Sequence, residues 1–289
     1  MRFRTGIEAI STLLKVFQSV NKISTHCILN LSPDEVRIIC TGESDGVQIW
    51  TTLTKDQFFK DYRVESKYKN IINLEISTEM LISVLKSAQD TSDVTMRLAK
   101  RGSDPLLSFA IVSMSHTGAK MEIEHEVLIK LIKPPDWEQI REPHCPEPDV
   151  HIVLPRLLKM RTVAERMSRM SFQITFSANL EGALTLGITS DEVNVETTWR
   201  GLSHPEFRTD ENDGDAKGAP QRGKQQGEFR SVTLEMRSFL RFLSSYNVET
   251  STIACICVDH CAIFYVYIGD QQHPGGVMTF FIPGLISDT

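Results

Sequence analysis

The feature that most constrains the fold of this chain is a spacing: four short amphipathic helix patterns recur at nearly equal intervals. They begin near Glu8, Ser77, Pro155 and Leu234, which places them 69, 78 and 79 residues apart. Runs of alternating apolar and polar residues, typical of strands, lie between them. A period on this scale predicts one unit of helix and strands that is used four times.

Positive charge is concentrated on these four patterns. Residues 8–22, 77–90, 155–170 and 234–246 contain ten Lys or Arg and five Asp or Glu, whereas the whole chain has a net charge of −6. The helices therefore carry +5 and the remainder −11, a division that favours a polyanion along the helices and repels it elsewhere. We call these ten the basic helix residues: Lys15, Lys22, Lys86, Arg156, Lys159, Arg161, Arg166, Arg169, Arg237 and Arg241.

The helix patterns also have apolar stripes that must pack on another element. The stripe of the first helix consists of Ile10, Leu13, Leu14, Phe17 and Val20, and that of the third of Leu157, Met160, Ala164 and Met167. In the third helix Lys159, Arg166 and Arg169 fall within about 80° of one another, at about 100° per residue. A single basic face is usually only a solvated surface, but its recurrence in an acidic chain favours a binding role.

The segments between the helices alternate as half-buried strands do. The clearest are residues 121–131, 172–178 and 193–199, where apolar and polar side chains take opposite faces. Short strands with interspersed helices lack the strict alternation of a doubly wound fold. We therefore predict an α+β fold, with helices packed on one face of antiparallel sheets.

Length and composition predict two domains. A chain of 289 residues with 41% hydrophobic and 24% charged residues is typical of a soluble globular protein of two domains. Five prolines in residues 134–149 exclude regular helix or internal strand there, so this segment is the predicted linker between domains 1–133 and 150–289. An extended linker can border a peptide-binding groove or serve only as a connector; the groove candidates are Trp137, Ile140, Pro143, Pro146 and Pro148.

A second break covers residues 201–227, where apolar residues are almost absent after Arg208, and we predict a disordered surface loop.

The opening MRFRTGIEAI lacks the apolar core of a signal peptide, and no run approaches the roughly 18 apolar residues of a membrane span. These features predict an intracellular protein without membrane contact. The six cysteines are then expected to be reduced and mostly buried.

Two motifs suggest chemistry, but their context argues against it. Ser44 lies in a G-x-S-x-G match, yet the strand-like runs on both sides and the following Asp-Gly predict a hairpin turn. Residues 210–215 resemble a calcium loop with a displaced glycine and no glutamate at the twelfth position. We therefore expect neither an enzyme nor a cofactor.

A metal site is not expected either. Four side chains near the C-terminus could bind zinc, namely Cys255, Cys257, His260 and Cys261. They lack the C-x2-C spacing of a zinc knuckle, and they span the end of one strand, a turn and the start of the next.

Several segments together resemble a known family. They are MRFR, NLSPDEVRIIC, GVQIWTTL, DQFF, LEISTEMLISVLKSAQD, the linker REPHCPEPDVHIVLP with the basic helix RLLKMRTVAERM, and FFIPGL. In combination they resemble the Hus-one subunits of the checkpoint sliding clamp, and more distantly proliferating cell nuclear antigen. The likeness spans nearly the whole chain. It implies two clamp domains, with antiparallel sheets outside and four helices lining the inner face of a ring.

The resemblance also implies partners. These are clamp subunits of the Rad-nine and Rad-one types, double-stranded DNA inside the ring, an ATP-driven clamp loader and repair enzymes, in the nucleus with a cytoplasmic pool left open. Ring closure requires exposed sheet edges. By resemblance these are residues 106–114 and 172–178, with Leu106, Phe109, Ile111, Met114, Phe172, Ile174 and Phe176 at the interface.

Three alternatives remain open. A homotrimeric replicative clamp would assemble from this chain alone. A scaffold that does not bind DNA would use the linker groove, and its behaviour would not depend on salt. An enzyme would act through Ser44 or the cysteine cluster.

Overall fold

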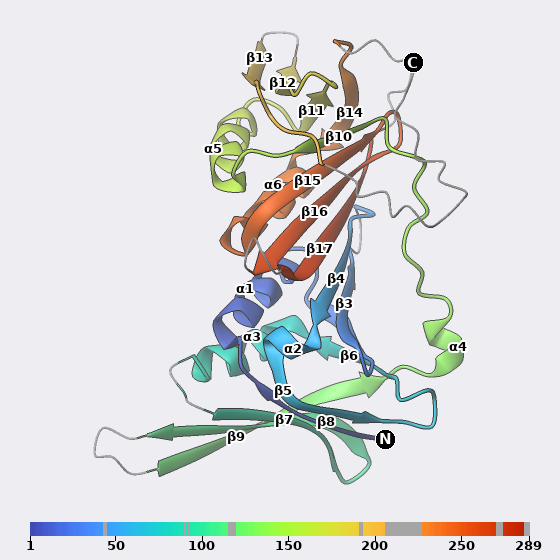
Figure 1. Cartoon of the computed structure of the whole chain (residues 1–289), viewed down its shortest axis with the longest axis vertical. Helices are drawn as coiled ribbons and strands as arrows, with labels where there is room; N and C mark the ends of the chain where they lie inside the picture. The colour runs from blue at the N-terminus through green and yellow to red at the C-terminus, as the bar shows by residue number, and fades with distance from the viewer. Residues whose placement is uncertain are drawn as a thin grey trace. The chain divides into compact units, whose positions relative to one another are not determined.

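The structure is a computed structural model of the whole chain. It describes residues 1–42, 45–89, 91, 93–114, 120–190, 193–205, 227–269 and 274–285, with Met114, Lys120 and Pro274 described by their backbone alone. Helices and antiparallel sheets are mixed (Figure 1), which confirms the predicted α+β class. Of the helices in these ranges, none is long and apolar enough to cross a membrane.

All four predicted helices are present. They are α1 (Ile10–Val20), α3 (Thr78–Ser87), α5 (Leu157–Met167) and α6 (Met236–Leu243), and each begins within two residues of its predicted start. The first and third apolar stripes are buried in full, as expected. The short helix α2 (Lys55–Phe58) and the 3-10 turn η1 (Ser244–Asn247) were not predicted.

The linker contains one helical turn, α4 (Pro134–Trp137), so the prediction that its prolines exclude helix is wrong for these four residues. A proline is tolerated in the first turn of a helix because the amide it lacks has no partner there. The Trp137 amide completes the turn by donating to the Lys133 carbonyl at 3.0 Å.

The chain divides into two compact units. The first comprises Met1–Pro143, Ser244–Thr250 and Tyr265–Phe281, and the second His144–Leu243, Ser251–Phe264 and Ile282–Thr289. The chain thus passes from one unit to the other inside the predicted linker, but C-terminal segments belong to both units. The domain bounds 1–133 and 150–289 stay predictions, and most of the predicted loop 201–227, residues 206–226, lies outside the described residues.

The first unit is built on the strand order β17-β4-β3-β2-β6-β9-β8-β7-β1-β5. Its pairs are antiparallel. The strands are β1 (Arg2–Ile7), β2 (His26–Leu31), β3 (Glu35–Thr41), β4 (Gln48–Thr54), β5 (Phe59–Glu65), β6 (Ile72–Ser77), β7 (Asp93–Arg101), β8 (Asp104–Met114), β9 (Lys120–Leu131) and most of β17 (Pro274–Pro283).

The second unit contains a four-stranded antiparallel sheet in the order β13-β12-β11-β14, and a pair of β10 with β15. Its strands are β10 (Val150–Val153), β11 (Gln173–Ala178), β12 (Leu184–Thr189), β13 (Asn194–Trp199), β14 (Arg230–Glu235), most of β15 (Glu249–Cys257) and the first half of β16 (Cys261–Gly269).

In the first unit α1 and α3 pack side by side (Figure 1). Their buried apolar side chains lie against side chains of the strands. Leu13 and Phe17 of α1, Leu81 and Leu85 of α3, and Phe109 of β8 surround the same small apolar space. The Thr78 hydroxyl at the start of α3 donates to the Asn21 side chain at the end of α1, which ties the two helices together. The basic residues of this helix pair consequently point away from the core.

In the second unit α5 packs against α6, and phenylalanines connect α6 to the strands. Phe242 of α6 stacks on Phe264 of β16 with ring centroids 4.0 Å apart. Phe239 lies 5.9 Å from Phe176 of β11 and 6.1 Å from Phe264. Because all four rings are fully buried, this aromatic cluster is the centre of the second core.

Replacing Phe242 with alanine should therefore lower the free energy of unfolding of the second unit by about 3–5 kcal/mol, through lost burial and a residual cavity. Urea denaturation followed by tryptophan fluorescence measures the change. Phe172, which is 90% exposed just before β11, provides the matched control. Its alanine variant should change stability by less than about 0.5 kcal/mol, and similar losses in both variants would contradict this account of the core.

Candidate nucleic-acid and assembly interface

The ten basic helix residues lie on or next to the four helices, and eight of them are exposed. Arg161 and Arg241 are half-buried. Arg156 is the N-cap residue of α5, while Lys22 and Arg169 lie just beyond the ends of α1 and α5. Because the apolar stripes face the sheets, each helix pair presents its basic side chains to solvent.

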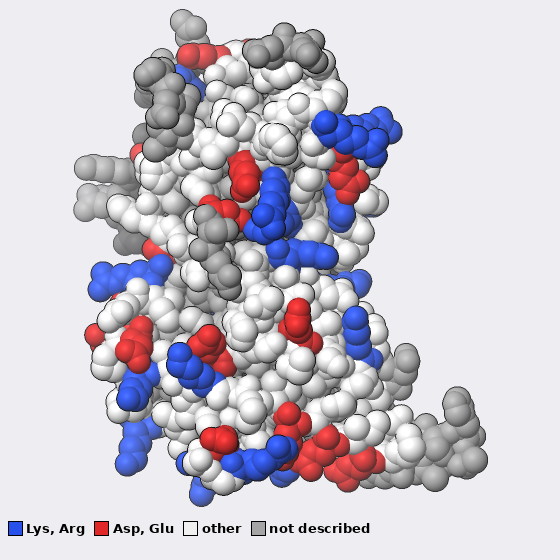
Figure 2. Space-filling view, turned by 180° about the vertical axis from the view of Figure 1, so that it is seen from behind, with Lys and Arg blue, Asp and Glu red and all other residues white. Residues whose placement is uncertain are grey.

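The charge is uneven between helices. Helix α5 and its flanks carry five of the ten residues, whereas α3 carries one of them, Lys86, together with an acidic residue, Glu79. Arg161 donates to Glu165 at 2.7 Å, an i,i+4 ion pair that partly neutralises this position. On the face drawn in Figure 2, basic and acidic side chains are interspersed, and acidic ones gather over the part of the first unit that contains β9. Positive potential is therefore local to particular helix faces.

The prediction that residues 106–114 and 172–178 form sheet edges is wrong. Strand β8 pairs with β7 on one side and β9 on the other, and β11 pairs with both β12 and β14. Their apolar side chains form core and are at most 1% exposed: Leu106, Phe109, Ile111, Ile174 and Phe176. Phe172 is exposed but precedes β11, and the side chain of Met114 lies outside the described residues. Alternation of apolar residues indicates that one face of a strand is buried. It does not distinguish a central strand from an edge strand, because both can bury one face.

Open edges occur elsewhere. Within the described ranges, residues 120–128 of β9 pair with β8 alone, since the ladder to β6 involves only Ile129, Lys130 and Leu131. Strand β13 likewise pairs with β12 alone among the described strands. Each β13 residue is half-buried or exposed, and Met121 and Ile123 of β9 are 46% and 37% exposed.

A sequence signal for the β9 edge existed. Glu122, Glu124 and Glu126 occupy successive positions on one face of β9, and charge is a common device on exposed edges. The alternation by itself predicts only that these residues form the solvated face of a strand. Two of these glutamates form ion pairs within the same sheet: Glu124 pairs with Arg97 of β7 at 2.8 Å, and Glu126 pairs with Arg101 of β7.

The second half of the linker is attached to the β15–β16 hairpin. Cys257 Sγ donates to the Pro146 carbonyl at 3.5 Å, and the Val258 amide donates to Asp149 Oδ2 at 3.1 Å. The Asp149 amide also donates to the Ile256 carbonyl at 2.8 Å. The predicted groove stays a prediction; of its candidates, Trp137, Ile140, Pro143 and Pro148 are half-buried and Pro146 is exposed.

The group of Cys255, Cys257, His260 and Cys261 does not come together as one set. Cys255 Sγ lies 3.0 Å from Nδ1 of His151, its cross-strand neighbour on β10. Burial raises the pKa of Cys255 to about 12, so this thiol stays protonated at neutral pH. His260 and Cys261 are instead joined by Cys145 of the linker, which the sequence did not indicate as a ligand. Ser44 and residues 210–215 lie outside the described residues.

The β9 edge contains a carboxylate whose pKa is lowered. The Ser108 hydroxyl donates to Glu124 at 2.7 Å, and this hydrogen bond is the main reason why the pKa of the carboxyl lies below its ordinary value. A hydrogen bond from Arg97 makes the second contribution. Because the pKa of Glu124 is lower in the folded chain, its ionised carboxylate stabilises the folded chain at every pH above the ordinary pKa of a glutamate. This stabilisation is lost as the pH falls through the lowered pKa.

We expect Ser108→Ala to raise the pKa of Glu124 toward its ordinary value, as measured by carbon-13 NMR titration of the glutamate carboxyls. Ser103→Ala, in the β7–β8 turn, is the control and should leave the pKa of Glu124 unchanged. An unchanged value in the Ser108 variant would show that Arg97 alone sets it.

The comparisons agree with this architecture. The model of the "Hus1-like protein" family matches residues 1–286. Similar proteins include "Checkpoint protein hus1" of Schizosaccharomyces pombe, 32% identical over 98% of each chain, and "Checkpoint protein HUS1" of Homo sapiens, 27% identical over 99% of this chain and 100% of that one. Among solved structures, the proliferating cell nuclear antigen of Entamoeba histolytica superposes over 98% of this chain and 99% of its own, with a TM-score of 0.72 at 12% identity. A structure of the PCNA2–PCNA3 complex from Sulfolobus tokodaii superposes over 97% and 98%, with a TM-score of 0.70 at 13% identity. The chain therefore has the sliding-clamp fold, and it belongs to the Hus1-like family.

Proposed function

We propose that this chain is a non-catalytic subunit of a heterotrimeric DNA-damage checkpoint clamp. Its partners are subunits of the Rad-nine and Rad-one types, and the closed ring encircles double-stranded DNA in the nucleus. An ATP-driven loader places it at damage sites, where it supports checkpoint kinase signalling and repair enzymes. The observation that carries this proposal is the family match over residues 1–286, together with a clamp fold along 98% of the chain.

DNA binding in this proposal depends on the basic helix residues. Exposed Lys and Arg on rigid helices attract phosphates without reading bases, so the contact is independent of sequence and weakens with salt. Eight exposed cations distributed over four helices give modest affinity for each subunit. Enclosure by the ring supplies retention, and weak contacts allow the ring to slide.

Ring closure in this proposal uses the open edges of β9 and β13. A head-to-tail ring needs two different surfaces on each subunit, and two strands that each have one open edge, in different units, meet that requirement. The exposed apolar side chains of Met121 and Ile123 next to the open ladder of β9 favour a protein partner over solvent. Backbone pairing along residues 120–128 would add main-chain hydrogen bonds to that contact.

The decisive experiment measures stoichiometry. The chain is mixed with its Rad-nine-type and Rad-one-type partners, and the mass is determined by light scattering, with the chain alone as control. A 1:1:1 species found only in the mixture supports the proposal. A homotrimer of the chain alone would instead indicate a replicative clamp, and a monomer that persists in the mixture would favour a scaffold.

In the assembled clamp, replacing Lys159 and Arg166 together with alanine should weaken duplex binding at every sequence. Loss of two phosphate contacts should reduce the slope of log affinity against log salt by about 1.8, at about 0.9 per contact. Fluorescence anisotropy over a salt series measures it. The matched control is Lys100→Ala with Lys133→Ala, two exposed lysines outside the helices, and an equal change in both pairs would contradict a helix-borne contact.

Assembly should be sensitive to charge at the β9 edge. Ile123→Asp places a carboxylate beside Met121 on the apolar face of the open β9 edge, so we expect at least a tenfold weaker trimer, about 1.4 kcal/mol. Tyr68→Asp, at an exposed site between β5 and β6, should assemble normally. Charge at buried Phe109 or Ile174 would test folding and not assembly. Normal assembly of the Ile123 variant would reject β9 as an interface.

A further inference from the structure

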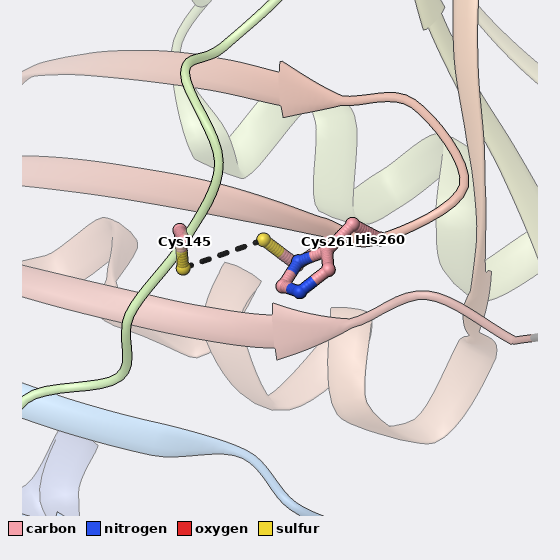
Figure 3. Close-up of side chains that lie close together, drawn as sticks. All are labelled: Cys145, His260 and Cys261. Carbon is pink, nitrogen blue, oxygen red and sulfur yellow. Dashed lines mark hydrogen bonds between the residues drawn. The ribbon is translucent and has the colours of Figure 1, made fainter.

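Three side chains of metal-ligating type converge in the second unit from two segments that are distant in sequence. Cys145 belongs to the linker, whereas His260 and Cys261 lie at the turn from β15 to β16 (Figure 3). Cys261 Sγ donates to Cys145 Sγ at 3.5 Å across a separation of 116 residues. One ligand atom from each of the three residues lies within 4.8 Å of the others.

The backbone of the hairpin positions His260 and Cys261. Asp259 has a φ of 56°, a left-handed conformation that forms the tight turn between the strands. The His260 amide donates to the Cys257 carbonyl at 3.1 Å, and the His260 carbonyl accepts from the Gly284 amide at 2.7 Å. A Cβ on Gly284 would lie 3.0 Å from that carbonyl oxygen, so the glycine allows the two backbone segments to approach closely. These backbone contacts fix the position of the His260 Cα, from which the imidazole side chain extends.

The linker brings Cys145 to the same point by independent contacts. Pro146 and Asp149 are hydrogen-bonded to Cys257, Val258 and Ile256 of the hairpin, as described above. Pro143 and Pro146 flank the segment and restrict its backbone. The three ligands are thus held together by contacts in which their own side chains take no part, which lowers the entropic cost of binding an ion.

The donor set selects the kind of ion. We propose that Cys145, His260 and Cys261 bind Zn²⁺, with water as the fourth ligand. Two thiolates and an imidazole suit zinc and lack the oxygen ligands that Ca²⁺ or Mg²⁺ require. Zn–S bonds of about 2.3 Å in a tetrahedron separate two sulfurs by about 3.8 Å, close to the 3.5 Å between Cys145 and Cys261. His260 is exposed and Cys145 half-buried, which leaves a path for the ion and the water.

Binding releases two protons to solvent, one from each thiol, and requires no oxidant. The ion then fastens the second half of the linker to the β15–β16 hairpin. Because the metal binds only the folded arrangement, it also stabilises the second unit against unfolding. This inference is independent of the proposed clamp function, since it concerns a site within one unit of one chain.

The full-length chain, kept reduced, is titrated with Co²⁺ as a spectroscopic substitute for zinc. Thiolate-to-cobalt charge-transfer absorption in the near ultraviolet and tetrahedral d–d bands in the visible are expected, and Zn²⁺ should abolish both. The variants Cys145→Ser and Cys261→Ser each remove one thiolate and should reduce the charge-transfer absorption to half or less. His260→Ala, at an exposed position where folding is not at risk, should bind at least tenfold more weakly.

Cys255→Ala is the matched control. Cys255 lies on the same hairpin and also contacts a histidine, His151, but within the described residues the group of three metal-ligating side chains does not include it, so its removal should leave cobalt binding intact. Circular dichroism confirms that each variant is folded. Absence of a charge-transfer band in the unmodified chain, or the same band in the Cys145 and Cys261 variants, would overturn the proposal. A thiol titration of the purified chain, unfolded in denaturant with a metal chelator present, that finds fewer than its six thiols would also overturn it, by indicating a disulfide in place of a metal site.

Discussion

Burial of one apolar face of each helix on antiparallel sheets is the constraint on which the rest of this structure depends. A stripe such as Ile10, Leu13 and Phe17 can leave water only by packing on a sheet, and this burial is the dominant favourable term in folding. In both units two helices share that task, α1 with α3 and α5 with α6. Once the stripes are buried, lysines and arginines on the same helices can lie only on the outer side. The cationic surface of this acidic chain is thus a consequence of how its core is packed.

The two units solve the same packing problem with different residues. In the first core Phe17, Phe59 and Phe109 lie among aliphatic side chains around one apolar space. In the second core four phenylalanines contact one another, including the stacked pair Phe242 and Phe264. Repetition of the architecture therefore does not require repetition of the sequence. This explains how a Hus1-like chain retains the clamp fold at 12% identity to proliferating cell nuclear antigen. What is shared is the pattern of buried faces, which many combinations of apolar side chains satisfy.

The linker and the strand edges bear on function in different ways. Edges present unpaired backbone groups, and a chain that does not use them must protect them. The acidic row on β9 is compatible with either role, but Met121 and Ile123 beside it favour an interface. The linker is extended for most of its length, yet its second half is attached to a hairpin by hydrogen bonds of Pro146 and Asp149. That attachment brings Cys145 to His260 and Cys261. The linker thus contributes a candidate metal ligand, which a segment that only connects two domains would not do.

The sequence by itself determined the fold class, the four helices, their buried stripes, the basic residues beside them and the family. These features are local, because amphipathic period, charge and motif can be read from residues close together in the chain. Tertiary structure decided which strands are edges and which residues meet. Ile111 and Ile174 alternate as edge residues could, but their strands have neighbours on both sides, and pairing partners are distant in sequence. Cys145 meets Cys261 for the same reason: 116 residues separate them, and only the path of the folded chain brings them together.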